Sequence, residues 1–119
     1  MNERYSFRNL EVWKISISLA ERIYKLTGNF PITENYGITS QLRRSSISIS
    51  NNICEGRGRL TKGEYKHFLG IARGSSYEVS NLIELCLRLQ FGKKEELEEL
   101  YDLNDKISSM LFNLIKTLK

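Results

Sequence analysis

Apolar side chains recur at intervals of three and four residues along most of this chain, which is the spacing of one face of an α-helix. Short stretches with glycine or proline separate four such segments, and these predict helices over residues 10–27, 36–57, 62–91 and 94–118. Helices joined by short connections pack as antiparallel neighbours. The pattern therefore predicts an all-α fold, an up-and-down antiparallel four-helix bundle that forms a single domain over residues 1–119.

The first predicted helix carries two adjacent apolar stripes, and Asn9 is its expected N-cap. The stripes consist of Trp13, Ile17, Ala20 and Tyr24 on one side and of Val12, Leu19, Ile23 and Leu26 on the other. Together they are wider than one neighbouring helix covers. We therefore expect this helix either to be deeply buried or to share a face with a second subunit.

The second segment is ambiguous at residues 46–50, where serine and isoleucine alternate as they do in a half-buried strand. The wider window favours a helix, because helical spacing continues from Ile38 to Ile53 and an isolated strand would have no partner. On such a helix Ile47 and Cys54 lie away from the main apolar face. This second apolar stripe again suggests contacts beyond one subunit.

Particular residues mark the expected helix ends. Gly56 and Gly58 are predicted to close the second helix, and Gly92 to close the third. Thr61 and Glu64 form a capping-box pattern, which predicts the start of the third helix.

Several polar residues are expected to hold helices or subunits together. Glu78 projects among apolar neighbours, and we expect it either to pair with Arg43 or Arg44 or to be solvated. Glu55 precedes Arg59 by four residues, so the two are predicted to pair across one helical turn.

Gly70 and Gly74 make a GxxxG pattern opposite the main face of the third helix. In this context the pattern is expected to mark either a close helix crossing or a tolerated pair of glycines.

The charge balance narrows the choice of partner. The chain has 18 Lys and Arg against 14 Asp and Glu, a formal charge of +4 and a pI of about 9.1, and residues 1–60 hold nine basic against five acidic residues. This mild excess is either chance or a preference for polyanions such as RNA or DNA.

The positions of the basic residues indicate which of them are candidates for binding a polyanion. Basic side chains surround the junction between the second and third helices and continue along the third, where the helix start adds N–H donors suited to phosphate. The candidate nucleic-acid-binding residues are Arg44, Arg57, Arg59, Lys62, Lys66 and Arg73. Solvation of helix faces is the competing interpretation of these residues.

The sequence offers little for catalysis or metal binding. Glu64 and His67 have the E-x-x-H spacing of di-iron bundles, but such a site needs a second copy of the motif and His67 is the sole histidine. We expect no catalytic residue, no metal and no cofactor. Cys54 and Cys86 are expected to be free thiols, and the chain to be a cytoplasmic protein without a signal peptide or membrane span.

Three stretches, FRNLEVWK, GITSQLRRSSISISNNICEGRGR and YKHFLGIARGSSYEVSNLIEL, resemble the 23S rRNA-intervening sequence proteins, a family similar to the accessory variability determinant of diversity-generating retroelements. The resemblance covers nearly the whole chain. The residues that match are Arg43, Arg44, Asn52, Glu55, Gly56, Arg73, Gly74, Ser75 and Glu78. Some of them, Arg43, Asn52, Glu55 and Glu78 above all, are expected to serve structural or inter-subunit contacts.

The resemblance implies an up-and-down bundle that assembles into a homopentamer. Most members of the family have no established biochemical role, whereas the retroelement relatives are implied to bind nucleic acid and a reverse transcriptase through basic surfaces. We expect a non-enzymatic protein that binds RNA or DNA backbone, alone or as an accessory to a ribonucleoprotein or reverse transcriptase. The charge of +4 is low for such a surface, although five copies would carry about +20, and fields of that size steer polyanions. The alternative is a protein-protein interaction scaffold that binds no nucleic acid.

Overall fold

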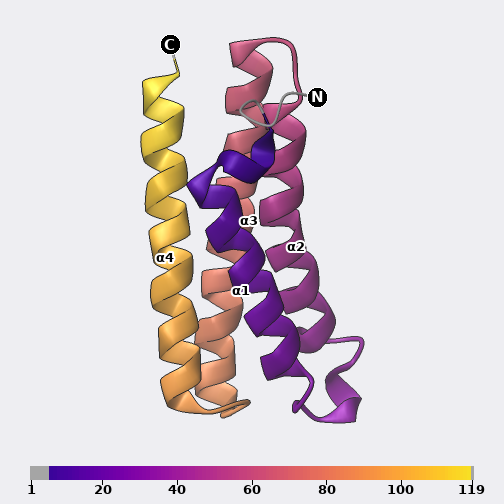
Figure 1. Cartoon of the computed structure of the whole chain (residues 1–119). Coiled ribbons are helices and arrows are strands. Elements are labelled where there is room, and N and C mark those ends of the chain that lie inside the picture. Colours follow the sequence, from indigo (N-terminus) through magenta and orange to yellow (C-terminus); the bar gives the residue numbers. More distant parts are fainter. Residues whose placement is uncertain (1–5, 119) are drawn as a thin grey trace.

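A computed structural model describes residues 6–118 as a bundle of four long helices (Figure 1). The helices are α1 (Glu11–Thr27), α2 (Ile38–Arg57), α3 (Lys62–Leu89) and α4 (Lys94–Thr117), with the short 3₁₀ helices η2 (Phe7–Asn9) and η3 (Ile32–Glu34). Each helix packs against its neighbour in the chain, and α4 also packs against α1. The predicted all-α, up-and-down architecture is confirmed.

The helix bounds lie within two residues of those expected, and the differences have local causes. Asn9 belongs to η2, and Leu10 is the N-cap of α1 without a side-chain cap, so the predicted Asn9 cap was wrong. At the end of α3, Gln90 adopts a left-handed conformation with φ of 60°. The helix therefore ends before Gly92, whose own φ is 87°.

The alternating serines and isoleucines of α2 are helical throughout. Ser46 and Ser50 donate hydroxyl hydrogen bonds to the carbonyls of Arg43 and Ile47, at 3.0 and 3.1 Å. Serine hydroxyls that bond the preceding turn are satisfied without any partner on another helix. Ile49, between them, is fully buried. The alternation of serine and isoleucine is therefore compatible with a helix, in which Ile49 packs in the core and the serine hydroxyls bond their own helix.

Gly56 lies inside α2 and does not close it, contrary to the sequence prediction; the C-cap is Gly58. A Cβ at Gly56 would stand 2.8 Å from Cβ of Phe68 and 3.1 Å from Cδ1 of Tyr65. Only a residue without a side chain allows α2 and α3 to approach this closely. Gly70 and Gly74, by contrast, have no neighbouring atom within 4 Å of such a Cβ, so they make no close crossing within the chain.

The core contains one buried polar cluster between α3 and α4. The Asn104 side chain accepts from the Ser76 hydroxyl at 2.8 Å and donates to the Ser76 carbonyl at 2.8 Å and to the Ser80 hydroxyl at 2.7 Å. Asn104 and Ser76 are fully buried, and a buried amide that keeps its hydrogen bonds avoids the cost of desolvation. These hydrogen bonds connect α3 to α4 inside the core.

The two stripes of α1 are buried to different degrees. Val12, Leu19 and Ile23 belong to the core, whereas Trp13 is half-buried and Tyr24 is 44% exposed. Within one chain, deep burial of the whole helix was therefore a wrong expectation. The alternative, a face shared with a second subunit, stays a prediction.

Both cysteines are free, Cys54 half-buried and Cys86 buried, and burial raises the pKa of the Cys86 thiol to about 11. Over residues 6–118, none of the helices is both long and apolar enough to cross a membrane.

Candidate nucleic-acid interface

The α2–α3 connection lies at the same end of the bundle as η2 and the last turn of α4 (Figure 1). Four candidate residues are close in sequence around this connection, and we call them the cationic end: Arg57, Arg59, Lys62 and Lys66. Lys62 and Lys66 are exposed, and no carboxylate pairs with either one in the described part of the chain. Two of the four cations are thus open to an outside anion.

Arg59 has partners within the chain. Its Nη2 donates to Oε2 of Glu55 at 2.6 Å, which confirms the predicted pair across one turn. Its guanidinium also lies 4.6 Å from the ring centroid of Phe68. Both members of the ion pair are substantially exposed, so the pair adds less than about 1 kcal/mol to stability and leaves the guanidinium accessible.

Arg57 lies above Tyr65, with its guanidinium carbon 6.0 Å from the ring centroid. Nε of Arg57 and the Tyr65 hydroxyl are buried, and neither has a hydrogen-bond partner among residues 6–118. Burial raises the pKa of the Tyr65 phenol, and the neighbouring Arg57 guanidinium offsets part of that rise. Arg57 therefore carries a charge without a carboxylate partner in the described chain.

The start of α3 adds backbone donors to the cationic end. Thr61 is the N-cap, and its hydroxyl accepts from the N–H of Glu64 at 3.1 Å, which confirms one of the two hydrogen bonds of the predicted capping box. The backbone N–H groups of Lys62 and Gly63 have no hydrogen-bond acceptor among the described residues. Free N–H groups and the helix dipole at this position favour a phosphate.

Arg73 lies further along α3, on the side that faces α4. Its guanidinium carbon is 5.0 Å from the ring centroid of Tyr77 and 5.1 Å from that of Phe112, and Nη2 donates to the Tyr77 hydroxyl at 3.1 Å. Two aromatic rings thus hold this guanidinium in place without neutralising it.

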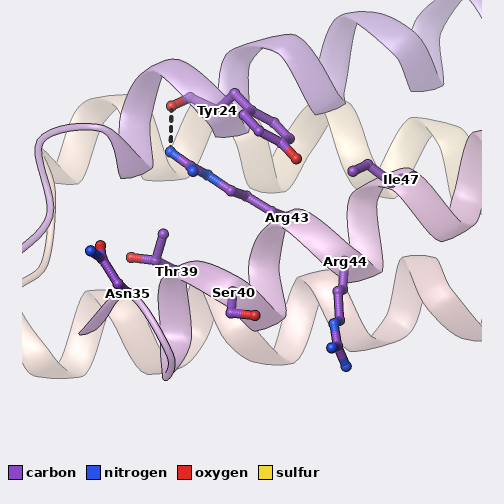
Figure 2. Close-up of a pocket in the computed structure, with 7 residues that line it drawn as sticks. All are labelled: Tyr24, Asn35, Thr39, Ser40, Arg43, Arg44 and Ile47. Carbon is purple, nitrogen blue, oxygen red and sulfur yellow. Dashed lines mark hydrogen bonds between the residues drawn. The ribbon is translucent and has the colours of Figure 1, made fainter. Parts of the chain in front are cut away.

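Arg43 and Arg44, adjacent in sequence, point in different directions (Figure 2). Arg43 reaches α1, where it donates to the Thr27 hydroxyl at 2.9 Å and to the Tyr24 carbonyl at 3.4 Å and lies over the Tyr24 ring. Arg44 is exposed and contacts no described residue through a hydrogen bond or ion pair. Both line a hollow of about 350 Å³ between α1 and α2.

Arg44 is separate from the cationic end. Arg44 precedes Arg57 by 13 positions, or about 20 Å of helix, so the structure does not bring the six candidates into one patch. Of the two alternatives for Glu78, the structure shows the solvated one and no pair with Arg43 or Arg44 in the described chain. Glu78 is exposed and accepts from the Ser45 hydroxyl at 3.3 Å, since Arg43 is engaged with α1.

Asn52 connects to the α2–α3 contact through Ser48. Its amide donates to the Ser48 carbonyl at 2.8 Å and hydroxyl at 3.1 Å, and the Ser48 hydroxyl is 2.8 Å from that of Ser75 on α3. These bonds lie within one chain. Asn52 is therefore a structural residue here, and an additional inter-subunit role stays a prediction.

Aromatic partners of the arginines were missed in the sequence. Tyr77 follows Arg73 by four residues, so helical spacing alone could have paired them. The contacts of Tyr65 with Arg57 and of Phe68 with Arg59 depend on the close approach of α2 and α3 at Gly56, which the sequence does not indicate. Phe112 could not be paired with Arg73 without the register of α4.

The E-x-x-H pair of Glu64 and His67 has no additional ligands nearby. Among residues 6–118, no three or more His, Cys, Asp and Glu side chains gather in a way that could hold a metal ion. The neighbour of the His67 ring is Phe68, at 5.5 Å between centroids.

The fold and these side chains define a four-helix up-and-down bundle with a basic end. The sequence model of the 23S rRNA-intervening sequence protein family matches residues 8–113, so the chain belongs to that family. The chain is similar to the crystal structure of a protein of unknown function from the S23 ribosomal protein family of Bacteroides thetaiotaomicron VPI-5482. The identity is 27% and the TM-score 0.80, over 88% of this chain and 98% of that one. A comparison with curated proteins finds no match.

Proposed function

We propose that this chain is a non-enzymatic helical bundle that binds the phosphate backbone of RNA or DNA through its cationic end. The observation that carries the proposal is the set of open donors at one place. Lys62 and Lys66 lack carboxylate partners in the described chain, Arg57 is equally unpaired, and the first N–H groups of α3 point to the same end.

Contacts of this kind recognise charge. Lysine and arginine contacts to phosphate fix the position of a protein on nucleic acid but carry no sequence information. Arg73 extends the contact along α3, whereas Arg44, at the other end of α2, serves a separate contact. The binding is expected to be sensitive to salt and nearly indifferent to sequence.

The proposal includes assembly into a homopentamer. The half-buried α1 stripe that contains Trp13, together with half-buried Ile47 and Cys54 on α2, supports a subunit contact, because one chain leaves these apolar side chains partly exposed. Five copies would place five cationic ends in one particle. Such a particle would act as an accessory to a larger ribonucleoprotein or a reverse transcriptase.

A charge-reversal experiment tests the cationic end. We expect Lys62→Glu combined with Lys66→Glu to weaken binding of a fluorescent RNA oligonucleotide at least tenfold in an anisotropy titration at 50 mM salt. The reason is that each change removes a phosphate contact and adds a repulsive charge. Circular dichroism of the same samples checks that the helices are retained.

Lys93→Glu combined with Lys106→Glu is the matched control, with the same change in net charge. Both control residues are exposed, and Lys93 stands at the start of α4, at the opposite end of the bundle. We expect this variant to bind within about threefold of the original chain. An equal loss in both variants would contradict a localised site, and absence of binding by the original chain would overturn the proposal.

A protein-protein interaction scaffold is the second candidate. The observation that favours it is that Arg43 and Arg59 already have partners within the chain. A scaffold would keep its assembly and its protein partner when Lys62 and Lys66 are reversed. The same pair of variants therefore separates the two functions.

A further inference from the structure

A shallow groove runs between α3 and α4, outside the cationic end. It has a volume of about 520 Å³ and is lined by Gly70, Arg73, Gly74, Tyr77, Phe112 and Ile115. The sequence singled out Arg73, Gly70 and Gly74 separately, but it did not predict a groove between α3 and α4.

The groove has two glycines without neighbouring side chains and two exposed aromatic rings. The two glycines have nothing within 4 Å of an added Cβ, so they leave bare backbone facing solvent. Tyr77 is 59% exposed and Phe112 is 45% exposed. Exposed apolar side chains that lie together mark interaction surfaces and ligand-binding grooves, and aromatic rings offer flat faces for stacking.

The charge around the groove is positive. Arg73 lies between the Tyr77 and Phe112 rings, and Nζ of Lys116 is 5.3 Å from the Phe112 centroid. None of the residues that line the groove is Asp or Glu, whereas exposed Glu78 lines the adjoining hollow together with Gly74 and Tyr77. A ligand that fills this groove therefore meets aromatic faces and cations, and the carboxylate of Glu78 lies beside it only where Gly74 and Tyr77 border the adjoining hollow.

The groove continues the cationic end. Lys62, Lys66 and Arg73 are spaced by four and seven residues, which places them on one side of α3. The seven residues from Lys66 to Arg73 correspond to about 10 Å along the helix. Phosphate-binding lysines and the aromatic groove thus lie along one path.

We propose that this groove binds unpaired bases of single-stranded nucleic acid, which stack on Tyr77 and Phe112 while the backbone follows Lys62, Lys66 and Arg73. The inference rests on the proposed function and specifies the class of nucleic acid. Aromatic faces together with a cationic track are the means by which proteins bind single strands without sequence preference. A blunt duplex keeps its bases stacked inside and reaches only the lysines.

The test removes the aromatic faces and keeps the apolar bulk. We expect Tyr77→Leu combined with Phe112→Leu to weaken binding of a 12-nucleotide oligo(dT) about tenfold or more, the loss typical of one or two stacked bases. Binding of a blunt 12-base-pair duplex is expected to stay within about twofold. Tyr36→Leu combined with Tyr101→Leu, two exposed tyrosines outside the groove, is the matched control and should change neither affinity.

The outcomes separate this inference from the function on which it rests. Unchanged oligo(dT) affinity in the groove variant, with a loss on reversal of Lys62 and Lys66, would overturn the groove and keep the phosphate contact. Absence of binding to both oligonucleotides by the original chain would overturn both. A lower particle mass of the groove variant in sedimentation equilibrium would show that a second copy of the chain fills the groove, which also overturns the inference.

Discussion

The arginines of this chain differ in what their guanidinium groups contact. Arg43 is held by the end of α1 through Thr27 and Tyr24, and Arg59 by Glu55 and Phe68. Arg44 has neither kind of partner in the described residues. The sequence alone therefore does not distinguish an arginine that stabilises the fold from one that is free to bind a ligand. Arg43 and Arg44 are adjacent in sequence but point to different sides of α2 (Figure 2).

Asn104 provides a residue-scale test of the core. We expect Asn104→Ala to lower the free energy of unfolding by about 2–4 kcal/mol, because it removes three hydrogen bonds to Ser76 and Ser80 and leaves a cavity. Urea unfolding followed by circular dichroism, at one fixed protein concentration, measures the change.

Asn113→Ala on the exposed side of the same helix is the control and should alter the free energy of unfolding by less than about 0.5 kcal/mol. Equal effects of the two substitutions would show that the buried cluster does not stabilise the α3–α4 contact.

At the scale of the elements, helical periodicity was sufficient to predict all four helices. It outweighed the strand-like alternation of residues 46–50, because Leu42, Ile49 and Ile53 keep helical spacing. All three side chains are fully buried on one helix. The capping pattern at Thr61 was equally local and therefore predictable. Both features depend only on residues within a few turns of one another.

Features that depend on the approach of two helices could not be predicted. Gly56 was assigned to a helix end, because a glycine near the end of an apolar segment usually closes it. Its role is instead to let α2 and α3 approach at Tyr65 and Phe68. The same limit applies to the groove, where Arg73 of α3 meets Phe112 of α4 only once the register of the two helices is known.

At the scale of the whole molecule, charge is distributed along the long axis of the bundle. The α2–α3 connection carries the cationic end, whereas α4 begins at the opposite end with four glutamates in residues 95–99 (Figure 1). If the chain binds nucleic acid as proposed, we expect the polymer to approach the cationic end first.

Assembly is tested by particle mass. If the half-buried α1 stripe forms a subunit contact, sedimentation equilibrium should give about 69 kDa, the mass of five 13.8 kDa chains. Trp13→Glu, which would bury a charge in that contact, should lower the mass, whereas Glu21→Gln on the exposed side of the same helix should not. A mass of one chain at all concentrations would contradict the pentamer.

The salt dependence of nucleic-acid affinity tests the central claim most directly. Neutralisation of three phosphates of a single strand gives a slope of about −2 in log affinity against log salt, which is about a 20-fold loss between 50 and 200 mM. We expect a loss of this size or greater for RNA oligonucleotides of unrelated sequence. An affinity that changes less than threefold over this range, or no binding at 50 mM salt, would contradict a phosphate-binding cationic end.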